Sequence, residues 1–174
     1  MKNNSAESHD GLLIRNACIY SNAHRKLSES ILRSIDGVSD VSSDGGLFRR
    51  PTQFKLRTLD QPLGLNINCD HQKIKEHAAG MHGWINHIHA NSPIMNLDSF
   101  HGFVDQINQM YGVVVESEFS FYSPVWTTLL KIAESIQGVI FVHDSFVGCD
   151  GRILFGFLAD VDVADAAETD GDLP

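Results

Sequence analysis

The sequence lacks the features that mark secreted, membrane-spanning and nucleotide-binding proteins. Its three cysteines are far apart and form no CxxC pair, which argues against a disulfide framework and predicts reduced thiols packed as small apolar groups. No apolar run approaches the roughly 20 residues that span a bilayer, and residues 1–10 lack the apolar core of a signal peptide. Neither a Walker loop nor a GxGxxG motif is present. We therefore expect a cytoplasmic protein that binds neither membranes nor nucleotides.

Positive charge is scarce in the second half of the chain. Residues 1–75 hold 11 Lys/Arg and 8 Asp/Glu, whereas residues 76–174 hold 2 and 14. Such an acidic half repels nucleic acid, which proteins bind chiefly by neutralising phosphates. It favours a basic protein partner, whose encounter it speeds by long-range attraction. An acidic surface that serves solubility alone is the simpler alternative.

Length and hydrophobic patterning predict one α+β domain. The 174 residues are 43% apolar and 20% charged, an ordinary globular composition. We expect a disordered N-terminus at 1–10, a single domain at 11–158 and a flexible acidic tail at 159–174. Strands are expected at 11–20, 38–41, 53–59, 63–69, 111–116, 139–142 and 152–157, and helices at 24–35, 70–91, 97–110 and 124–136. This order predicts a mixed β-sheet packed by three to four helices.

The stretch Asp70–Asn91 is the longest predicted helix. Its apolar residues recur at intervals of three or four positions, so they form one stripe: Ile74, Ala78, Met81, Ile85 and Ile88. Asp70 is the expected N-cap. Gly80 and Gly83 interrupt this helix, where each costs about 1 kcal/mol relative to alanine. We interpret them as a notch that lets another element approach the backbone, with a kink as the alternative.

Five of the nine histidines also lie in this stretch, at positions 71, 77, 82, 87 and 89. No two are three or four residues apart, the spacing at which one helix supplies two ligands to one ion. We therefore expect a histidine-rich, partly exposed helix face, with no metal and no cofactor. A ligand pair from two elements, His82 with His101 or His143, remains an alternative.

No catalytic constellation is evident in the rest of the sequence. His143-Asp144-Ser145 contains the residue types of a hydrolase triad, but adjacent residues cannot adopt the relay geometry, so a turn between strands is expected. Cys149 has no evident neighbour to lower its pKa. The basic cluster Arg49, Arg50, Lys55 and Arg57 is expected to be a solvated strand face, with a phosphate or acidic partner as the alternative. These observations predict a protein that is not an enzyme.

Several stretches are similar to an uncharacterised bacterial family, a domain of unknown function. They are HAAGMHGWINHIHANS (77–92), LDSFHGFVDQINQMYGVVVESEF (97–119) and LLKIAESIQGVIFVHDSFVGCDGRILF (129–155), with IYSN (19–22) at the first strand and turn. The resemblance covers most of residues 11–157. It implies the same α+β fold and brings no functional residue.

The acidic half, the missing chemistry and this resemblance favour an immunity protein as our functional hypothesis. Such a protein binds a bacterial toxin, here a basic effector such as a nuclease, and blocks its active site. The expected partner-binding residues are carboxylates of the acidic half: Asp98, Asp105, Glu116, Glu118, Asp144 and Asp150. Two alternatives stay open: a metal-dependent enzyme or metal-binding protein that uses His82, His101 and His143, and a non-catalytic scaffold that forms a homo-oligomer.

Overall fold

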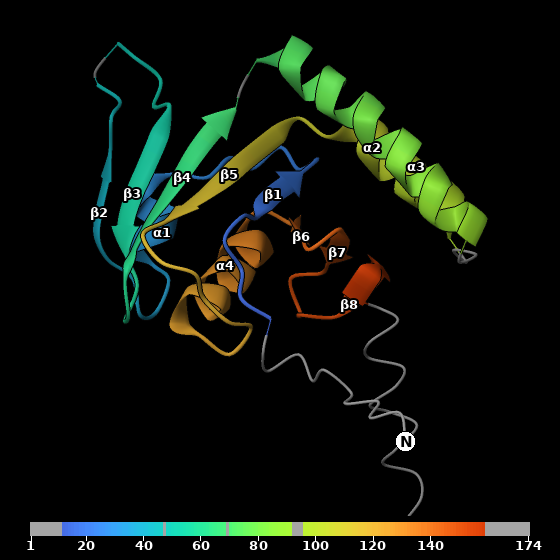
Figure 1. Ribbon diagram of the computed structural model, residues 1–174. Helices are drawn as coiled ribbons and strands as arrows, with labels where there is room; N and C mark the ends of the chain where they lie inside the picture. The colour runs from blue at the N-terminus through green and yellow to red at the C-terminus, as the bar shows by residue number, and fades with distance from the viewer. Residues whose placement is uncertain (1–11, 47, 69, 92–95, 159–174) are drawn as a thin grey trace, which may run out of the picture.

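An eight-stranded antiparallel sheet is the centre of the computed structural model, which describes residues 12–46, 48–68, 70–91 and 96–158 (Figure 1). The strand order is β2-β3-β4-β5-β1-β6-β7-β8. The strands are β1 (Cys18–Ser21), β2 (Ser39–Ser43), β3 (Gln53–Arg57), β4 (Pro62–Asn68), β5 (Gln109–Val115), β6 (Gly138–Val142), β7 (Ser145–Val147) and β8 (Ile153–Gly156). The helices are α1 (Glu29–Arg33), α2 (His71–Asn91), α3 (Leu97–Gln106) and α4 (Pro124–Ser135).

This architecture confirms the predicted α+β domain but corrects the predicted mixed sheet. Every strand pair in the described part of the chain is antiparallel. The α4 crossover does connect two strands that run in the same direction, β5 and β6. The N-terminal strand β1 lies between them and pairs with both, so the two never meet as a parallel pair.

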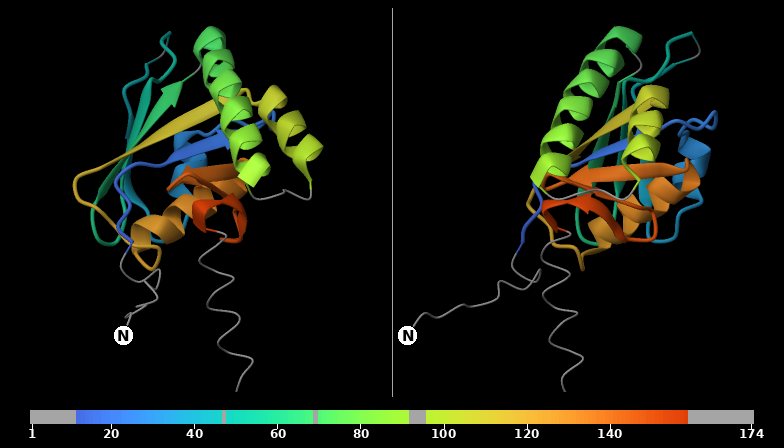
Figure 2. Two further views of the ribbon diagram at one scale, coloured as in Figure 1. Left: turned by 45° about the vertical axis from the view of Figure 1, so that its right-hand side comes forward. Right: turned by 90° about the vertical axis from the view of Figure 1, so that its right-hand side faces the viewer.

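Helices cover the two faces of the sheet unequally. The green α2 and the orange α4 lie on opposite sides of it (Figure 2). Alternate residues of one strand point into two separate cores, so Ile140 packs with α1 and α4 whereas Phe141 packs with α2 and α3. In β3 the second face is exposed at Lys55 and Arg57. The strict apolar–polar alternation of β3 predicted this half-buried strand, and the prediction is confirmed.

Side-chain caps start two of the helices, and the one at Asp70 is the cap that the sequence predicts. Asp70 Oδ1 accepts a hydrogen bond from the Gln72 amide at 3.0 Å, and Ser123 Oγ accepts one from the Trp126 amide at 3.2 Å. Asn96, at the start of α3, makes no side-chain hydrogen bond to its helix. Helix starts are therefore predicted best where a strong cap precedes a clear apolar stripe.

The N-terminal helix is shorter than its pattern suggests. Gln109 donates hydrogen bonds to the carbonyls of Ala23 and Arg25, and the Leu27 amide donates to the Tyr111 hydroxyl. These long-range bonds satisfy backbone groups that a helix over 24–35 would have used internally, so α1 begins only after Ser28. Strand β1 likewise covers only the end of the predicted strand 11–20.

The long helix keeps its stripe but not its notch. Ile74, Met81 and Ile85 are buried against the sheet and α3. A Cβ atom added at Gly80 or Gly83 would meet nothing within 4 Å, and both residues are exposed. The prediction that these glycines seat another element is therefore wrong. Their substitution by alanine is sterically free.

Two of the predicted segments cannot be compared with the structure. The N-terminus at 1–10 and the acidic tail at 159–174 lie outside the described residues, as does Cys69. Among the helices described, none has the length and apolar character needed to cross a membrane.

Candidate functional site

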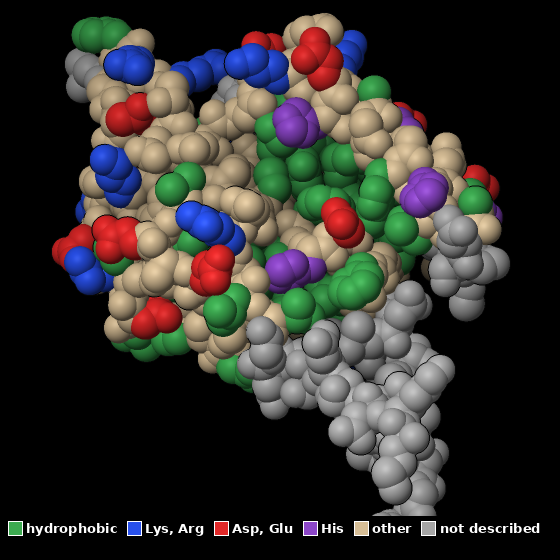
Figure 3. All heavy atoms as spheres, viewed as in Figure 1, with side chains coloured by type: hydrophobic (Ala, Val, Ile, Leu, Met, Phe, Trp, Pro, Cys, Tyr) green, Lys and Arg blue, Asp and Glu red, His purple; other side chains and the backbone are tan. Residues whose placement is uncertain are grey.

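An open groove lies beside α2 and continues past Phe141 of β6. Its first part, about 480 Å³, is lined by residues of α2, β1 and β6: Tyr20, Glu76, His77, Gly80, Met81, Trp84 and Phe141. Phe141 also borders a second hollow of about 380 Å³, which reaches Arg15, Cys18 and the β6–β7 turn. Figure 3 shows the hydrophobic side chains gathered on this face, with histidine and acidic side chains among and around them. We call these two hollows together the α2 groove.

Aromatic rings form the wall of the α2 groove and anchor α2 to the sheet. Trp84 meets Phe141 edge-on at a ring-centroid distance of 5.3 Å, and Phe141 meets Phe146 at 5.1 Å. Phe155 continues the cluster and contacts Phe100 of α3 at 4.2 Å. Trp84 and Phe141 are only partly buried, so the cluster is both a small core and an apolar surface.

The groove contains a thiol and a phenol, both of low acidity. Burial raises the pKa of the Cys18 thiol to about 11, against hydrogen bonds from Tyr20 and Tyr111 that lower it. Burial also raises the pKa of the neighbouring Tyr20 hydroxyl well above its ordinary value. Neither group supplies a nucleophile at neutral pH. Cys149 is also a free thiol but is exposed in the β7–β8 turn.

The β6–β7 turn confirms the interpretation of His143-Asp144-Ser145 as a hairpin. His143 and Asp144 have φ angles of 44° and 50°, and Val142 pairs with Ser145 across them. Such a two-residue loop with positive φ at both positions is a type I′ turn. The His143 Nε2 atom is the one buried side-chain nitrogen or oxygen that has no hydrogen-bond partner among the described residues.

The structure brings His82 and His101 together but leaves His143 apart from them. The two Nδ1 atoms lie 2.6 Å apart between α2 and α3, and Asp105 contacts His82 Nε2 at 2.9 Å. His143 lies in the β6–β7 turn, its ring 6.2 Å from that of Phe121. Within the described ranges, no group of three or more His, Cys, Asp or Glu side chains is placed to hold a metal ion. Of the two long-range pairs that the sequence left open, the structure therefore brings together His82 and His101 but not His82 and His143.

The six predicted partner-binding carboxylates do not form one patch. Asp98 and Asp105 belong to α3, which precedes β5, whereas Glu116 and Glu118 follow it. A seven-residue strand spans about 23 Å, so these two pairs lie at opposite ends of the sheet. Asp150 is in the β7–β8 turn. Asp144 alone of the six borders the α2 groove, with Glu76 at its other part.

The basic residues show a similar separation. Lys55 and Arg57 lie on the exposed face of β3, where Arg57 is 3.7 Å from Asp40. Arg50 instead borders a hollow of about 360 Å³ with Lys26. The side-chain amide groups of Asn108 and Gln109 in this hollow already donate to backbone carbonyls. This hollow therefore has two exposed cations but no organised anion-binding site.

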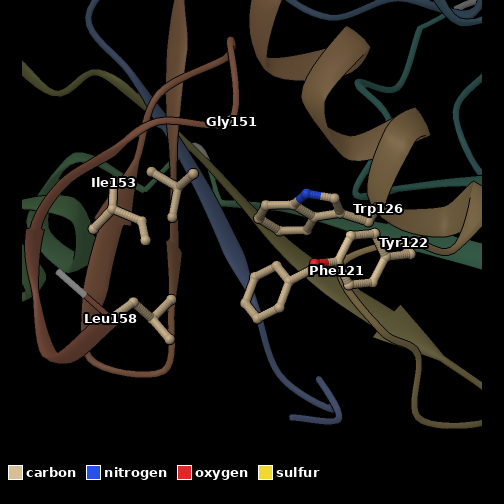
Figure 4. A pocket seen from close by; sticks show the side chains of 7 residues that line it. Phe121, Tyr122, Trp126, Gly151, Ile153 and Leu158 are labelled. Atoms are coloured by element: carbon tan, nitrogen blue, oxygen red, sulfur yellow. The ribbon is translucent and has the colours of Figure 1, made fainter. Parts of the chain in front are cut away.

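A further pocket on the α4 side is apolar. It encloses about 140 Å³ between the aromatic residues Phe121, Tyr122 and Trp126 and the aliphatic residues Val147, Ile153 and Leu158, with Gly151 at its edge (Figure 4). Phe121 meets Trp126 edge-on at 4.8 Å. Its lining residues include no carboxylate, imidazole or thiol. This pocket can hold a small apolar group but supplies no acid, base or nucleophile.

The residues that border the α2 groove on the sheet were missed by the sequence analysis. The signal was present in β6, where Phe141 alternates with the buried Ile140 and Val142 and so must face the other side.

No family model matches the chain, and neither does any curated protein or solved structure. The site must therefore be interpreted from its own chemistry.

Proposed function

We propose that this protein is a non-catalytic inhibitor of the immunity type, which binds a bacterial toxin in the cytoplasm and blocks its active site. The observation that carries the proposal is the α2 groove. Its wall contains the part-exposed rings of Trp84 and Phe141, and such aromatic side chains dominate the binding energy of protein interfaces. The two hollows share Phe141, so one segment of the partner can contact both.

Charge around the groove supports a basic partner. Glu76 borders its first part, Asp144 and Arg15 border its second, and the whole chain has a net charge of −9. A nuclease carries a cationic surface for its own substrate, which an acidic inhibitor can occupy. The low acidity of the Cys18 thiol supports a role in binding rather than nucleophilic catalysis.

The proposal is tested by co-expression with the product of the neighbouring gene, which we expect to be a secreted toxin. The wild-type chain should restore growth and form a complex that size-exclusion chromatography isolates. Gly80→Gln should lose both effects, because its side chain enters the groove, whereas the matched Gly83→Gln variant should keep them. Both positions are exposed on the same helix and are sterically open, but only Gly80 borders the groove. Absence of rescue and of a complex with the wild-type chain would refute the proposal.

The contribution of charge is measured separately by stopped-flow association. Glu76→Gln and Asp144→Asn together should slow association and reduce its salt dependence, since long-range attraction acts mainly on the encounter rate. Glu116→Gln and Glu118→Gln together are the matched control, because both residues follow β5 and neither borders the groove. Equal effects of the double variant and the control would contradict docking at the groove.

A further inference from the structure

His82 and His101 form a symmetric contact between two helices. Their ring centroids are 4.8 Å apart with an interplanar angle of 28°, and their Nδ1 atoms meet at 2.6 Å. The outer nitrogen of each ring meets an oxygen of the opposite helix. His82 Nε2 lies 2.9 Å from Asp105 Oδ1, and His101 Nε2 lies 3.1 Å from Asn86 Oδ1. Each helix thus supplies a histidine and, four residues later, an oxygen acceptor.

These oxygen partners determine where the imidazole protons lie. The Asp105 carboxylate and the Asn86 amide oxygen accept hydrogen bonds, so in this arrangement both Nε2 atoms donate. In the neutral rings both Nδ1 atoms then carry lone pairs, which repel each other across 2.6 Å. A metal ion between the two Nδ1 atoms would accept both lone pairs and remove this repulsion. The Asp105 carboxylate adds negative charge at the contact, which favours a cation there.

We propose that His82 and His101 bind an exchangeable divalent transition-metal ion, such as Zn²⁺, through their Nδ1 atoms. Imidazole nitrogens suit zinc, copper and nickel rather than magnesium or calcium. Metal-bound histidines usually donate their other N–H to a carboxylate or carbonyl oxygen, the arrangement that Asp105 and Asn86 provide here. Two ligands of a tetrahedral zinc ion are about 3.3 Å apart, so the rings need to separate by less than about 1 Å.

The ion bound here is exchangeable because the protein supplies only two ligands. The described residues contain no third metal-ligating side chain at this contact, so water completes the shell. Protons compete for the same nitrogens, and binding should weaken as pH falls. This inference is independent of the proposed function. It makes the α2–α3 contact responsive to metal.

The experiment titrates the full-length protein with Zn²⁺ at pH 7.5 by isothermal calorimetry. His82→Ala and His101→Ala should each remove the same binding event, which the wild-type protein shows with one ion. His77→Ala is the matched control on the same helix and should keep it, because His77 is exposed and outside the contact. Asp105→Asn retains both imidazoles and should bind about 10–100-fold more weakly, the usual effect of changing a group that orients a ligand.

A second measurement identifies the coordinating atoms. In histidine ¹⁵N spectra, Zn²⁺ should shift the Nδ1 signals of two histidines and leave their Nε2 atoms protonated. Both signals should be absent from the two alanine variants. The proposal is overturned if His82→Ala and His101→Ala bind zinc as the wild-type protein does, or if His77→Ala loses the same binding event.

Discussion

Gly80 and Gly83 offer a direct test of how α2 is packed. Both lie in the interior of a 21-residue helix, and a Cβ atom at either position would meet nothing within 4 Å. Glycine in such a position costs about 1 kcal/mol relative to alanine, because it loses more backbone freedom on folding. Gly80→Ala and Gly83→Ala should therefore each raise the free energy of unfolding by about 1 kcal/mol. The double variant should gain about 2 kcal/mol, since the two added methyl groups do not clash.

Urea denaturation monitored by tryptophan fluorescence and circular dichroism measures this gain. Trp84 reports on the α2 side of the sheet and Trp126 on the α4 side, so coincident transitions would justify a two-state treatment. The midpoint should rise without a change in slope, because the substitutions add little buried surface. In a chain of this size, about 1 kcal/mol corresponds to an increase of about 2–4 °C in melting temperature.

Gly138→Ala is the contrasting control. Its Cβ would lie 2.9 Å from the Tyr20 carbonyl oxygen and 3.1 Å from Ile19 Cγ2, so this variant should lose stability. The close approach of β1 explains the glycine here, whereas the positive φ after α4 belongs to Gln137. If Gly80→Ala and Gly83→Ala also lost stability, these glycines would seat another element, and our account of α2 would be wrong.

Three further predictions concern single groups. Iodoacetamide at neutral pH should modify Cys149 well before Cys18 in peptide maps, because burial raises the Cys18 pKa to about 11; equal rates would contradict this account. H143N/D144G should stabilise the protein to heat by about 1 kcal/mol, since an Asn-Gly turn adopts positive φ at low cost, and a lower melting temperature would contradict this. The hydroxyl of Thr52 and two backbone amides hold the pKa of Asp44 at about 2, below its ordinary 3.8, so Asp44→Asn should destabilise the protein in urea above pH 4, and the difference should shrink as pH falls towards 2.

Periodicity predicted most of the sheet because each strand pattern reports which faces are covered. The alternation in β3 and β4 corresponds to helices on one face only. The continuous apolar runs of β5 and β6 correspond to strands covered on both faces. Local patterns cannot reveal that β1 enters between β5 and β6, since strand order depends on pairing between distant residues. The predicted mixed sheet failed for that reason.

The site was less predictable than the fold because its parts come from different elements. His82 and His101 are 19 residues apart and meet through the turn between two helices. Spacing rules for metal ligands within one helix cannot detect such a pair. The predicted acidic surface failed to form one patch for the opposite reason, because β5 separates carboxylates that are close in sequence. Charge composition indicates a class of partner but does not locate its binding surface.

The unequal burial of the two helical layers leads to a last prediction. Three of residues 71–90 of α2 are buried, whereas six of the 12 residues of α4 are. The α2 layer should therefore open locally at a lower free energy than α4, and hydrogen exchange should be faster in its amides. Zinc that bridges His82 and His101 should slow exchange in α2 and α3 and leave α4 unchanged, because a ligand stabilises the state that binds it. Equal protection of α2 and α4 without zinc would contradict the unequal layers, and unchanged exchange at saturating zinc would contradict a metal bridge.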